Sequence, residues 1–152
     1  MKITVERYHD ISCGHRVVGH ESKCRNLHGH NYRITFICEA ATLDDMGRVV
    51  DFGVIKSTLC QWLEDVWDHK FLIWEKDPWV NACLELDAES FVLVPFNPTA
   101  ENMAMFLLAQ IGPYLLSGKG VELVRVVVEE TRKCSAVAEQ TPMQARFLGE
   151  VK

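Results

Sequence analysis

Two histidines stand one residue apart in the segment CRNLHGHNY, residues 24–32, and a cysteine lies four positions before the first of them. If this segment enters a strand, side chains alternate between its two faces, so His28 and His30 project from the same face. Two ligands of one small cation need this kind of separation, because a catalytic zinc ion takes three protein ligands and leaves a fourth position open. The pattern predicts a metal site, with an exposed polar turn as the alternative.

A third ligand must come from another segment. His15, in SCGHRV, is the natural candidate, because the strand that precedes it can pair beside the HGH strand. His9 and His20 compete for this role, and spacing alone does not exclude either.

Cys24 has two possible roles beside such a site. It could be the fourth ligand of a closed, structural zinc site, or a free base or nucleophile whose pKa a nearby cation lowers. By contrast, we expect Cys38, Cys60 and Cys83 to be small buried hydrophobic residues.

Acidic residues mark two further candidate positions. In WDHKF, Asp68 precedes His69, and a carboxylate can orient an imidazole and raise its basicity, as in acid–base relays; the alternative is an exposed helix end. In VELVRVVVEE, Glu130 completes a row of valines on one face of a strand. A carboxylate there needs a partner, and a ligand with paired N–H donors would provide one. Glu129, on the opposite face, is the alternative.

Several elements are expected to position these residues. KITVERY (2–8), HGHNYRITFICEA (28–40), FVLV (91–94) and VELVRVVVEE (121–130) have strand character. A turn and a short strand at 44–50 lead to Asp51, the expected N-cap of a helix from Gly53 to about Asp68. Thr99 should cap a second helix, which Pro113 bends or ends. Because these elements do not alternate regularly, the pattern favours an α+β fold with an antiparallel sheet.

Composition narrows the class of protein. The chain has 152 residues, of which 48% are hydrophobic, so a single domain over 1–152 with a real core is expected. A net charge of −5 argues against a nucleic-acid surface. No apolar run approaches the roughly 18–20 residues that span a bilayer. The first ten residues are charged and lack an apolar signal core, and the six cysteines form no CxxC pair. We therefore expect a cytoplasmic protein.

An ordered set of motifs carries a resemblance to a known family. The motifs are HR at 15–16, CxxxHGH at 24–30, VVDF at 49–52, WDHKFL at 67–72, NPTAEN at 97–102 and VVEET at 127–131. Together they resemble the 6-pyruvoyltetrahydropterin synthase superfamily, and most closely its 6-carboxy-5,6,7,8-tetrahydropterin synthase branch, in which three residues similarly separate the cysteine from HGH. Two departures are DISCGH in place of an aromatic-x-Ala-Ala-His entry, and Ala138 where the family often has tyrosine.

The resemblance implies a fold and a set of residue roles. The fold would be the tunnelling (T) fold, an antiparallel four-stranded sheet with two helices packed on one face. The chain would form a homo-oligomer built from trimers, such as a hexamer, with active sites at subunit interfaces. The implied zinc ligands are His15, His28 and His30. Cys24 matches the catalytic cysteine, Asp68 and His69 the relay pair, Glu130 the pterin-anchoring glutamate, and Thr99 and Glu101 residues that shape the pterin pocket.

The resemblance also implies a reaction. It is the zinc-dependent conversion of 7,8-dihydroneopterin triphosphate to 6-carboxytetrahydropterin, with release of acetaldehyde and triphosphate, on the route to queuosine and related 7-deazaguanines. Lys23, Arg25, Arg132 and Lys133 are candidate contacts for the triphosphate. The alternatives are a pyruvoyl-forming triphosphate lyase, an aldolase-like pterin enzyme, and a non-catalytic zinc-dependent binding protein in which Cys24 closes the metal shell.

Overall fold

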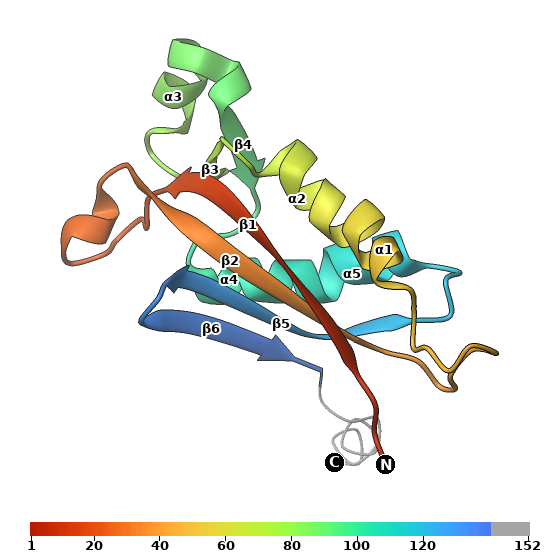
Figure 1. Cartoon of the computed structure of the whole chain (residues 1–152). Coiled ribbons are helices and arrows are strands. Elements are labelled where there is room, and N and C mark those ends of the chain that lie inside the picture. Colours follow the sequence, from red (N-terminus) through yellow and green to blue (C-terminus); the bar gives the residue numbers. More distant parts are fainter. Residues whose placement is uncertain (141–152) are drawn as a thin grey trace, which may run out of the picture.

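The strands that carry the candidate residues lie in one curved sheet (Figure 1). The computed structural model describes residues 1–140, and this part contains a six-stranded sheet of order β4-β3-β1-β2-β5-β6. Four of the strands form an antiparallel unit: β1 (Val5–His15), β2 (His28–Glu39), β5 (Glu122–Thr131) and β6 (Cys134–Glu139). Two four-residue strands, β3 (Phe71–Trp74) and β4 (Phe91–Val94), extend it in parallel beside β1. An antiparallel four-stranded unit is present as expected, but FVLV (91–94), predicted as a strand of an antiparallel sheet, is the parallel strand β4. The fourth antiparallel strand is β6, which the sequence patterns did not predict.

Two long helical segments cover one face of this sheet (Figure 1). The first joins α1 (Phe52–Ile55), the π-helical turn η2 (Lys56–Cys60) and α2 (Gln61–Val66). The second joins α4 (Ala100–Phe106), the π-helical turn η4 (Leu107–Ile111) and α5 (Gly112–Leu116). A third helix, α3 (Val80–Asp87), lies between β3 and β4, and short 3-10 turns occur at η1 (Lys23–Arg25) and η3 (Ala88–Ser90). The predicted α+β class and the two helices on one face are confirmed.

Side-chain caps fix where both helical segments begin. The Asp51 carboxylate accepts a hydrogen bond from the Gly53 N–H at 2.7 Å, and the Thr99 hydroxyl accepts one from the Asn102 N–H at 3.2 Å. Both were predicted N-caps, and each satisfies a backbone donor that a helix leaves free in its first turn. The start of α4 is therefore fixed next to the end of β1, where the candidate ligands lie.

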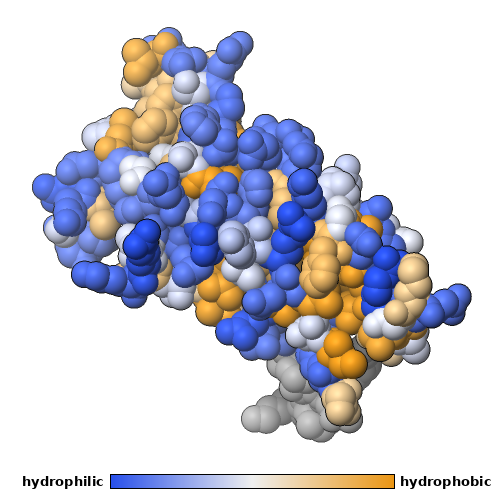
Figure 2. All heavy atoms as spheres, in the orientation of Figure 1, coloured by the Kyte–Doolittle hydropathy of each residue, from blue (hydrophilic) through white to orange (hydrophobic). Residues whose placement is uncertain are grey.

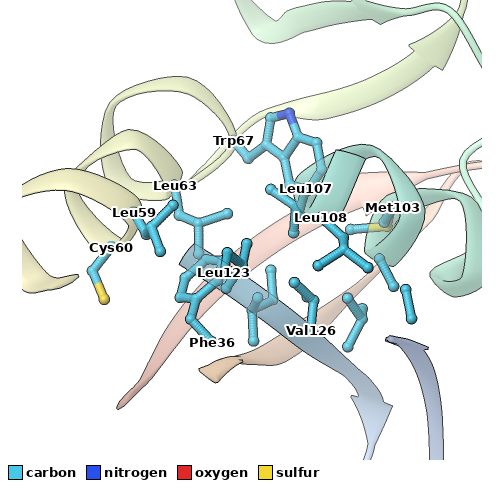
Figure 3. Close-up of a cluster of buried hydrophobic side chains, with 14 of the residues drawn as sticks. Phe36, Leu59, Cys60, Leu63, Trp67, Met103, Leu107, Leu108, Leu123 and Val126 are labelled. Carbon is cyan, nitrogen blue, oxygen red and sulfur yellow. The ribbon is translucent and has the colours of Figure 1, made fainter. Parts of the chain in front are cut away.

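The core lies between the helices and the inner face of the sheet (Figure 3). Phe36 on β2 and Val126 on β5 are fully buried, and Leu63 and Trp67 cover them from the first helical segment. Alternate residues of β1 and β2 face this core, which matches the period of two expected for strands with one buried face. The same alternation carries His15, His28 and His30 onto the inner face.

Three expectations about elements were wrong in detail. β1 begins at Val5 and runs on to His15, so it is longer than KITVERY and Ile3 lies outside it. Residues 49–50 form a bend without strand pairing, because Val49 is buried by packing against the core and not by a sheet partner. Pro113 does not end the helix, because the preceding π turn places it in the first turn of α5, where its missing N–H costs nothing.

Two features of the surface complete the fold. Figure 2 shows hydrophilic and apolar areas side by side on one face of the molecule. Within residues 1–140, no helix is both long enough and apolar enough to cross a bilayer.

Candidate metal centre and adjoining cavities

The pairing of β1 with β2 brings the candidate ligands together. His15 lies directly opposite His28 across the antiparallel ladder, and Cys13 lies opposite His30. Glycines permit the close approach here: a Cβ on Gly29 would lie 3.0 Å from the Cys13 carbonyl oxygen, and one on Gly14 would lie 2.2 Å from the Phe71 ring on β3. The two glycines therefore allow the ends of β1 and β2 to approach each other and β3 closely, on the face opposite the imidazoles.

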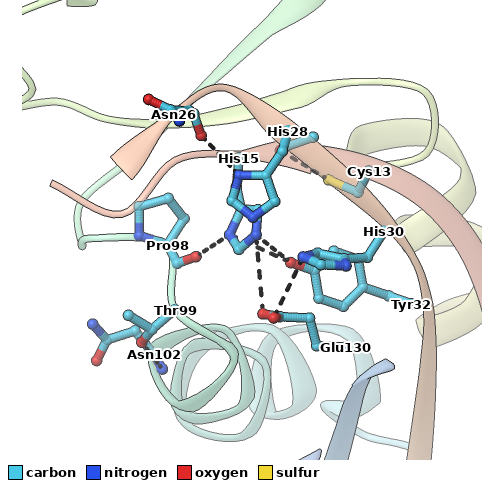
Figure 4. Close-up of polar contacts among 11 residues, drawn as sticks. Cys13, His15, Asn26, His28, His30, Tyr32, Pro98, Thr99, Asn102 and Glu130 are labelled. Carbon is cyan, nitrogen blue, oxygen red and sulfur yellow. Dashed lines mark hydrogen bonds and ion pairs between the residues drawn. The ribbon is translucent and has the colours of Figure 1, made fainter. Parts of the chain in front are cut away.

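Three histidines form a compact cluster of possible ligand atoms (Figure 4). One ring nitrogen from each of His15, His28 and His30 lies within 4.8 Å of the others, and it is the one group of this kind in the described chain. Cys24 is not part of the group. His9 instead meets Glu64, with Nε2 and a carboxylate oxygen 2.8 Å apart, and the His20 ring accepts the Ser22 N–H. The geometry thus favours His15 over its two competitors as the third ligand.

Backbone carbonyls fix the direction of two rings. His15 Nδ1–H donates to the Pro98 carbonyl oxygen at 2.6 Å, and His28 Nδ1–H donates to the Asn26 carbonyl oxygen at 2.7 Å (Figure 4). A proton held on Nδ1 leaves Nε2 as the free lone pair, the arrangement found when a histidine ligates a metal. His30 Nε2 is buried and has no hydrogen-bond partner, alone among buried side-chain nitrogens and oxygens of the described residues. A cation at the cluster would satisfy it, so the residues present fit zinc.

Burial also favours neutral imidazoles. Desolvation is the largest influence on both His15 and His30, and it holds the pKa of each below its usual value despite the nearby Glu130 carboxylate. Since a metal ligand must be deprotonated, these rings are available for a cation at neutral pH.

Glu130 faces the cluster, and Glu129 does not. One Glu130 carboxylate oxygen lies 3.4 Å from His30 Nε2, and the other lies 3.9 Å from His15 Nε2 (Figure 4). Glu129 pairs with Arg33 in the β2–β5 ladder, on the opposite face of the sheet. Glu130 therefore lies on the sheet face that the row of valines predicted, and its carboxylate lies beside the three imidazoles.

Cys24 opens into a small cavity next to the cluster. This cavity has a volume of about 300 Å³, and its walls include His15, Cys24, Thr99, Glu101 and Glu130. Cys24 is half-buried, whereas Cys13, Cys38, Cys60 and Cys83 are buried. Burial raises the pKa of both Cys13 and Cys38 to about 12, so these thiols are not reactive at neutral pH. Two accessible cysteines therefore line this cavity, the half-buried Cys24 and the exposed Cys134.

Asp68 and His69 form the expected pair but open into a different cavity. His69 Nδ1–H donates to Asp68 Oδ2 at 2.6 Å, and the other Asp68 oxygen accepts the Ser12 N–H at 2.9 Å. Burial by itself would raise the pKa of the Asp68 carboxyl, but these two bonds together with the charges of His69 and His9 lower it. His69 has a φ of 57°, an uncommon conformation that sites of function often retain. The pair lines a cavity of about 1020 Å³ that includes His30 and Glu130 but not Cys24.

The comparisons with known proteins agree with this geometry. Residues 2–141 match the family model described as 6-pyruvoyl tetrahydropterin synthase. The chain belongs to the 6-pyruvoyl tetrahydropterin synthase family.

Individual relatives refine the placement within the family. The chain is 32% identical over 126 residues to the 6-carboxy-5,6,7,8-tetrahydropterin synthase of Rickettsia bellii, covering 82% of this chain and 91% of that protein. It is 37% identical over 127 residues to a probable 6-carboxy-5,6,7,8-tetrahydropterin synthase of Halobacterium salinarum, covering 83% and 79%. The solved 6-pyruvoyl tetrahydropterin synthase of Caenorhabditis elegans superposes with a TM-score of 0.67 at 23% identity, covering 93% of this chain and 97% of that one. The last likeness shows that the fold is the tunnelling fold.

Two residues that support this site, Tyr32 and Asn97, were not predicted from the sequence. The Tyr32 hydroxyl is fully buried and lies 3.1 Å from His15 Nε2, and burial raises the Tyr32 pKa. The Asn97 side chain bonds both backbone groups of Val18, at 2.9 Å each. Tyr32 could have been found from its place on the HGH face. Asn97 lies in NPTAEN, but its partner is 79 residues away and carries no local signal.

Proposed function

We propose that this chain is a zinc-dependent lyase acting on 7,8-dihydroneopterin triphosphate. The product would be 6-carboxy-5,6,7,8-tetrahydropterin, formed with uptake of water and release of acetaldehyde and triphosphate, for the synthesis of queuosine and related 7-deazaguanines. One observation carries the proposal: ring nitrogens of three imidazoles lie within 4.8 Å of one another beside Glu130, and the half-buried Cys24 lies on the wall of the adjoining cavity. Relatives named for this activity, at 32–37% identity over most of the chain, support the choice of reaction.

His15, His28 and His30 would hold the zinc ion. A zinc ion with an open position acidifies bound hydroxyl groups and polarises a carbonyl. The Pro98 and Asn26 carbonyls would keep His15 and His28 in the ligating tautomer.

Glu130 would anchor the pterin ring. A carboxylate can accept two hydrogen bonds, from the 2-amino group and the N3–H of a pterin, and so fix the ring in register with the cluster. Glu130 lies where both cavities meet the histidines, which allows a ligand bound to it to reach Cys24. Thr99 and Glu101, at the start of α4, would form the side of the same pocket.

Cys24 and His69 would move protons. The Cys24 thiolate would accept a proton from the side chain of the substrate. His69, with Nδ1–H held by Asp68, presents Nε2 as a second base or, once protonated, as an acid. In one chain these two residues line separate cavities, so we place the relay pair at an interface, opposite the Cys24 of another copy.

The sheet supports such an assembly. Within residues 1–140, β4 and β6 are the two edge strands of the sheet, and each exposes an apolar side chain: Leu93 is 50% and Val137 49% exposed. Uncovered edges are templates for pairing with further strands, and symmetric assembly is a common way to cover them. We therefore propose a homo-oligomer built from trimers, such as a hexamer.

Product analysis tests the reaction. Purified protein incubated with 7,8-dihydroneopterin triphosphate should release acetaldehyde and triphosphate in equal amounts, with 6-carboxytetrahydropterin as the pterin product. Triphosphate without acetaldehyde would identify a pyruvoyl-forming lyase, and glycolaldehyde an aldolase-like enzyme. Absence of all three would leave a zinc-dependent binding protein.

The variant Cys24→Ala separates chemistry from coordination. We expect it to keep its zinc and its fold, because three histidines suffice as ligands, and to lose turnover by about 10²–10⁴-fold, the usual contribution of a general acid–base group. Cys134→Ala, on the wall of the same cavity, is the matched control. Loss of zinc from Cys24→Ala would make the thiol a ligand and favour the closed, non-catalytic site.

A further inference from the structure

A buried ion pair lies next to the metal centre. Arg16 follows His15 in the chain, and its Nε donates to Asp77 Oδ2 at 2.6 Å. Both residues are almost inaccessible, with exposed fractions of 8% for Arg16 and 2% for Asp77. The guanidinium carbon also lies 3.6 Å from the centre of the Trp79 ring, a cation–π contact. This group of three residues belongs to neither cavity described above.

Asp77 is oriented independently of Arg16. Its second carboxylate oxygen accepts the Trp79 N–H at 2.8 Å, in the turn that leads from β3 into α3. Its backbone N–H donates to the Trp74 carbonyl, and its own carbonyl accepts the Val80 N–H. The carboxylate is therefore a fixed acceptor for Arg16.

A second Arg16 donor contacts the loop that carries Cys24. Arg16 Nη1 donates to the Arg25 carbonyl oxygen at 3.1 Å. The preceding carbonyl, that of Cys24, accepts the Val17 N–H at 2.9 Å. Two successive residues after His15 thus hold two successive carbonyls at Cys24 and Arg25. This arrangement ties the thiol-bearing turn η1 to the strand end that carries a metal ligand.

Stability alone does not account for these contacts. A buried ion pair contributes little net stability relative to well-packed apolar residues, because both charges lose their hydration. An arginine fork does what an apolar pair cannot: it bonds a carboxylate and a carbonyl in fixed directions at once. The direction imposed here is toward the Cys24 loop.

We propose that Arg16, held by Asp77 and Trp79, positions the Cys24 thiol relative to the metal centre. Arg16 is a positioning residue, because it acts through the Arg25 carbonyl and not on a reacting atom. The inference rests on the proposed function for the role of Cys24, and it gives the β3–α3 turn a part in that function.

Two readouts on the intact protein test this role. One is steady-state turnover of 7,8-dihydroneopterin triphosphate together with zinc content. The other is the rate at which iodoacetamide alkylates each cysteine, followed by peptide mass spectrometry. The alkylation rates need no activity, and the exposed Cys134 is an internal reference. The variants are Arg16→Met, which keeps an unbranched apolar stem but removes the donors, and Asp77→Asn, which keeps the turn acceptor but removes the charge. Arg48→Met is the matched control, because Arg48 pairs with Asp44 and Asp51 at the surface.

In Arg16→Met, kcat should fall about 10- to 100-fold, the cost of a small misplacement of a reacting group. KM and zinc content should stay within about twofold, since Glu130 and the histidines are untouched. Cys24 should be alkylated faster because its loop is released, whereas Cys134 should keep its rate. Asp77→Asn should change both readouts in the same direction, and it decides the test if Arg16→Met does not fold.

An alkylation rate of Cys24 equal to that in the wild-type protein, measured in a folded variant, would overturn the proposal. Loss of zinc would also overturn it, because the effect would then act through His15. A wild-type protein without turnover would reject the proposed function. The alkylation rates would still decide whether Arg16 positions Cys24.

Discussion

At the residue scale, hydrogen bonds to the backbone distinguish the three histidines. His15 and His28 are held by backbone carbonyls, whereas His30 Nε2 has the Glu130 carboxylate at 3.4 Å and no hydrogen bond. Backbone carbonyls do not move when a side chain is replaced, so two ligand directions are built into the fold. The third depends on the cation itself.

Zinc content tests the ligand set. Purified protein should carry about one zinc ion per chain, and His28→Ala or His30→Ala should lose most of it, because two ligands do not hold the ion against exchange. His9→Ala is the control, since His9 pairs with Glu64 away from the cluster. Metal analysis by mass spectrometry after dialysis is the measurement. Full zinc occupancy in His28→Ala would reject the assignment.

Substrate affinity tests Glu130. Glu130→Gln keeps the shape but offers a donor where the pterin edge also donates, so binding should weaken by about 1.5–3 kcal/mol. Calorimetry in a Cys24→Ala background, where substrate is not consumed, measures this. Zinc content should not change, since a loss would make Glu130 a metal ligand. Glu129→Gln lies on the opposite face of β5 and should bind normally; a larger loss there would contradict the anchor.

The sequence predicted the position of a site residue correctly where strand alternation alone decides which face its side chain takes. His28, His30 and Glu130 project to one face because period two holds along β2 and β5. Contacts made by folding, such as Pro98 with His15 and Asp77 with Arg16, join residues 83 and 61 positions apart. No local pattern encodes them, although the HR and NPTAEN motifs contain one partner of each.

At the element scale, the segment before α4 supports the end of β1. The Asn97 side-chain amide accepts the Val18 N–H and donates to the Val18 carbonyl, as a neighbouring strand would. The backbone carbonyl of Asn97 accepts a hydrogen bond from Asn102 Nδ2 at 2.9 Å. The next carbonyl, that of Pro98, holds His15. The NPTAEN motif therefore links a helix start to a proposed metal ligand.

Replacing Asn97 by Asp tests this link. The new oxygen would face the Val18 carbonyl, so a donor is lost and two acceptors meet, which should destabilise the fold by about 1–3 kcal/mol. Urea unfolding of the metal-free protein is the measurement, and zinc affinity should also fall. Asn31→Asp is the control, because Asn31 Oδ1 accepts from the exposed Ser12 Oγ and an aspartate keeps that bond. Equal stability of the two variants would show that the link carries no energy.

The elements missed from the sequence are those with weak local signals. β3 pairs with β1 over only two residue pairs, and α3 buries a single residue, Cys83, so it has no apolar stripe. β6 consists mostly of small or polar residues and is defined by its pairing with β5. The long strands and both capped helices were found because their periodicity and caps are local.

At the scale of the whole molecule, one chain separates two groups that the proposed chemistry uses together. Cys24 lines the cavity of about 300 Å³, and His69 lines the cavity of about 1020 Å³ with its side chain 80% exposed. A relay histidine exposed to this extent would not control proton transfer until another surface covered it. Assembly through the open sheet edges would supply that surface.

Mixing two inactive variants tests whether copies share active sites. Cys24→Ala and His69→Ala should each have little turnover alone. If each site combines Cys24 of one copy with His69 of another, random mixing leaves about a quarter of the sites with both native residues. Co-expressed, differently tagged subunits purified through both tags should therefore recover up to about a quarter of native turnover.

If both residues act within one chain, every site keeps one defect and mixing restores nothing. A mixture of Cys24→Ala with Glu130→Gln, whose residues line one cavity of a single chain, is the control, and its turnover should not exceed the average of the two variants measured alone. Turnover in the control equal to that of the first mixture would remove the evidence for shared sites.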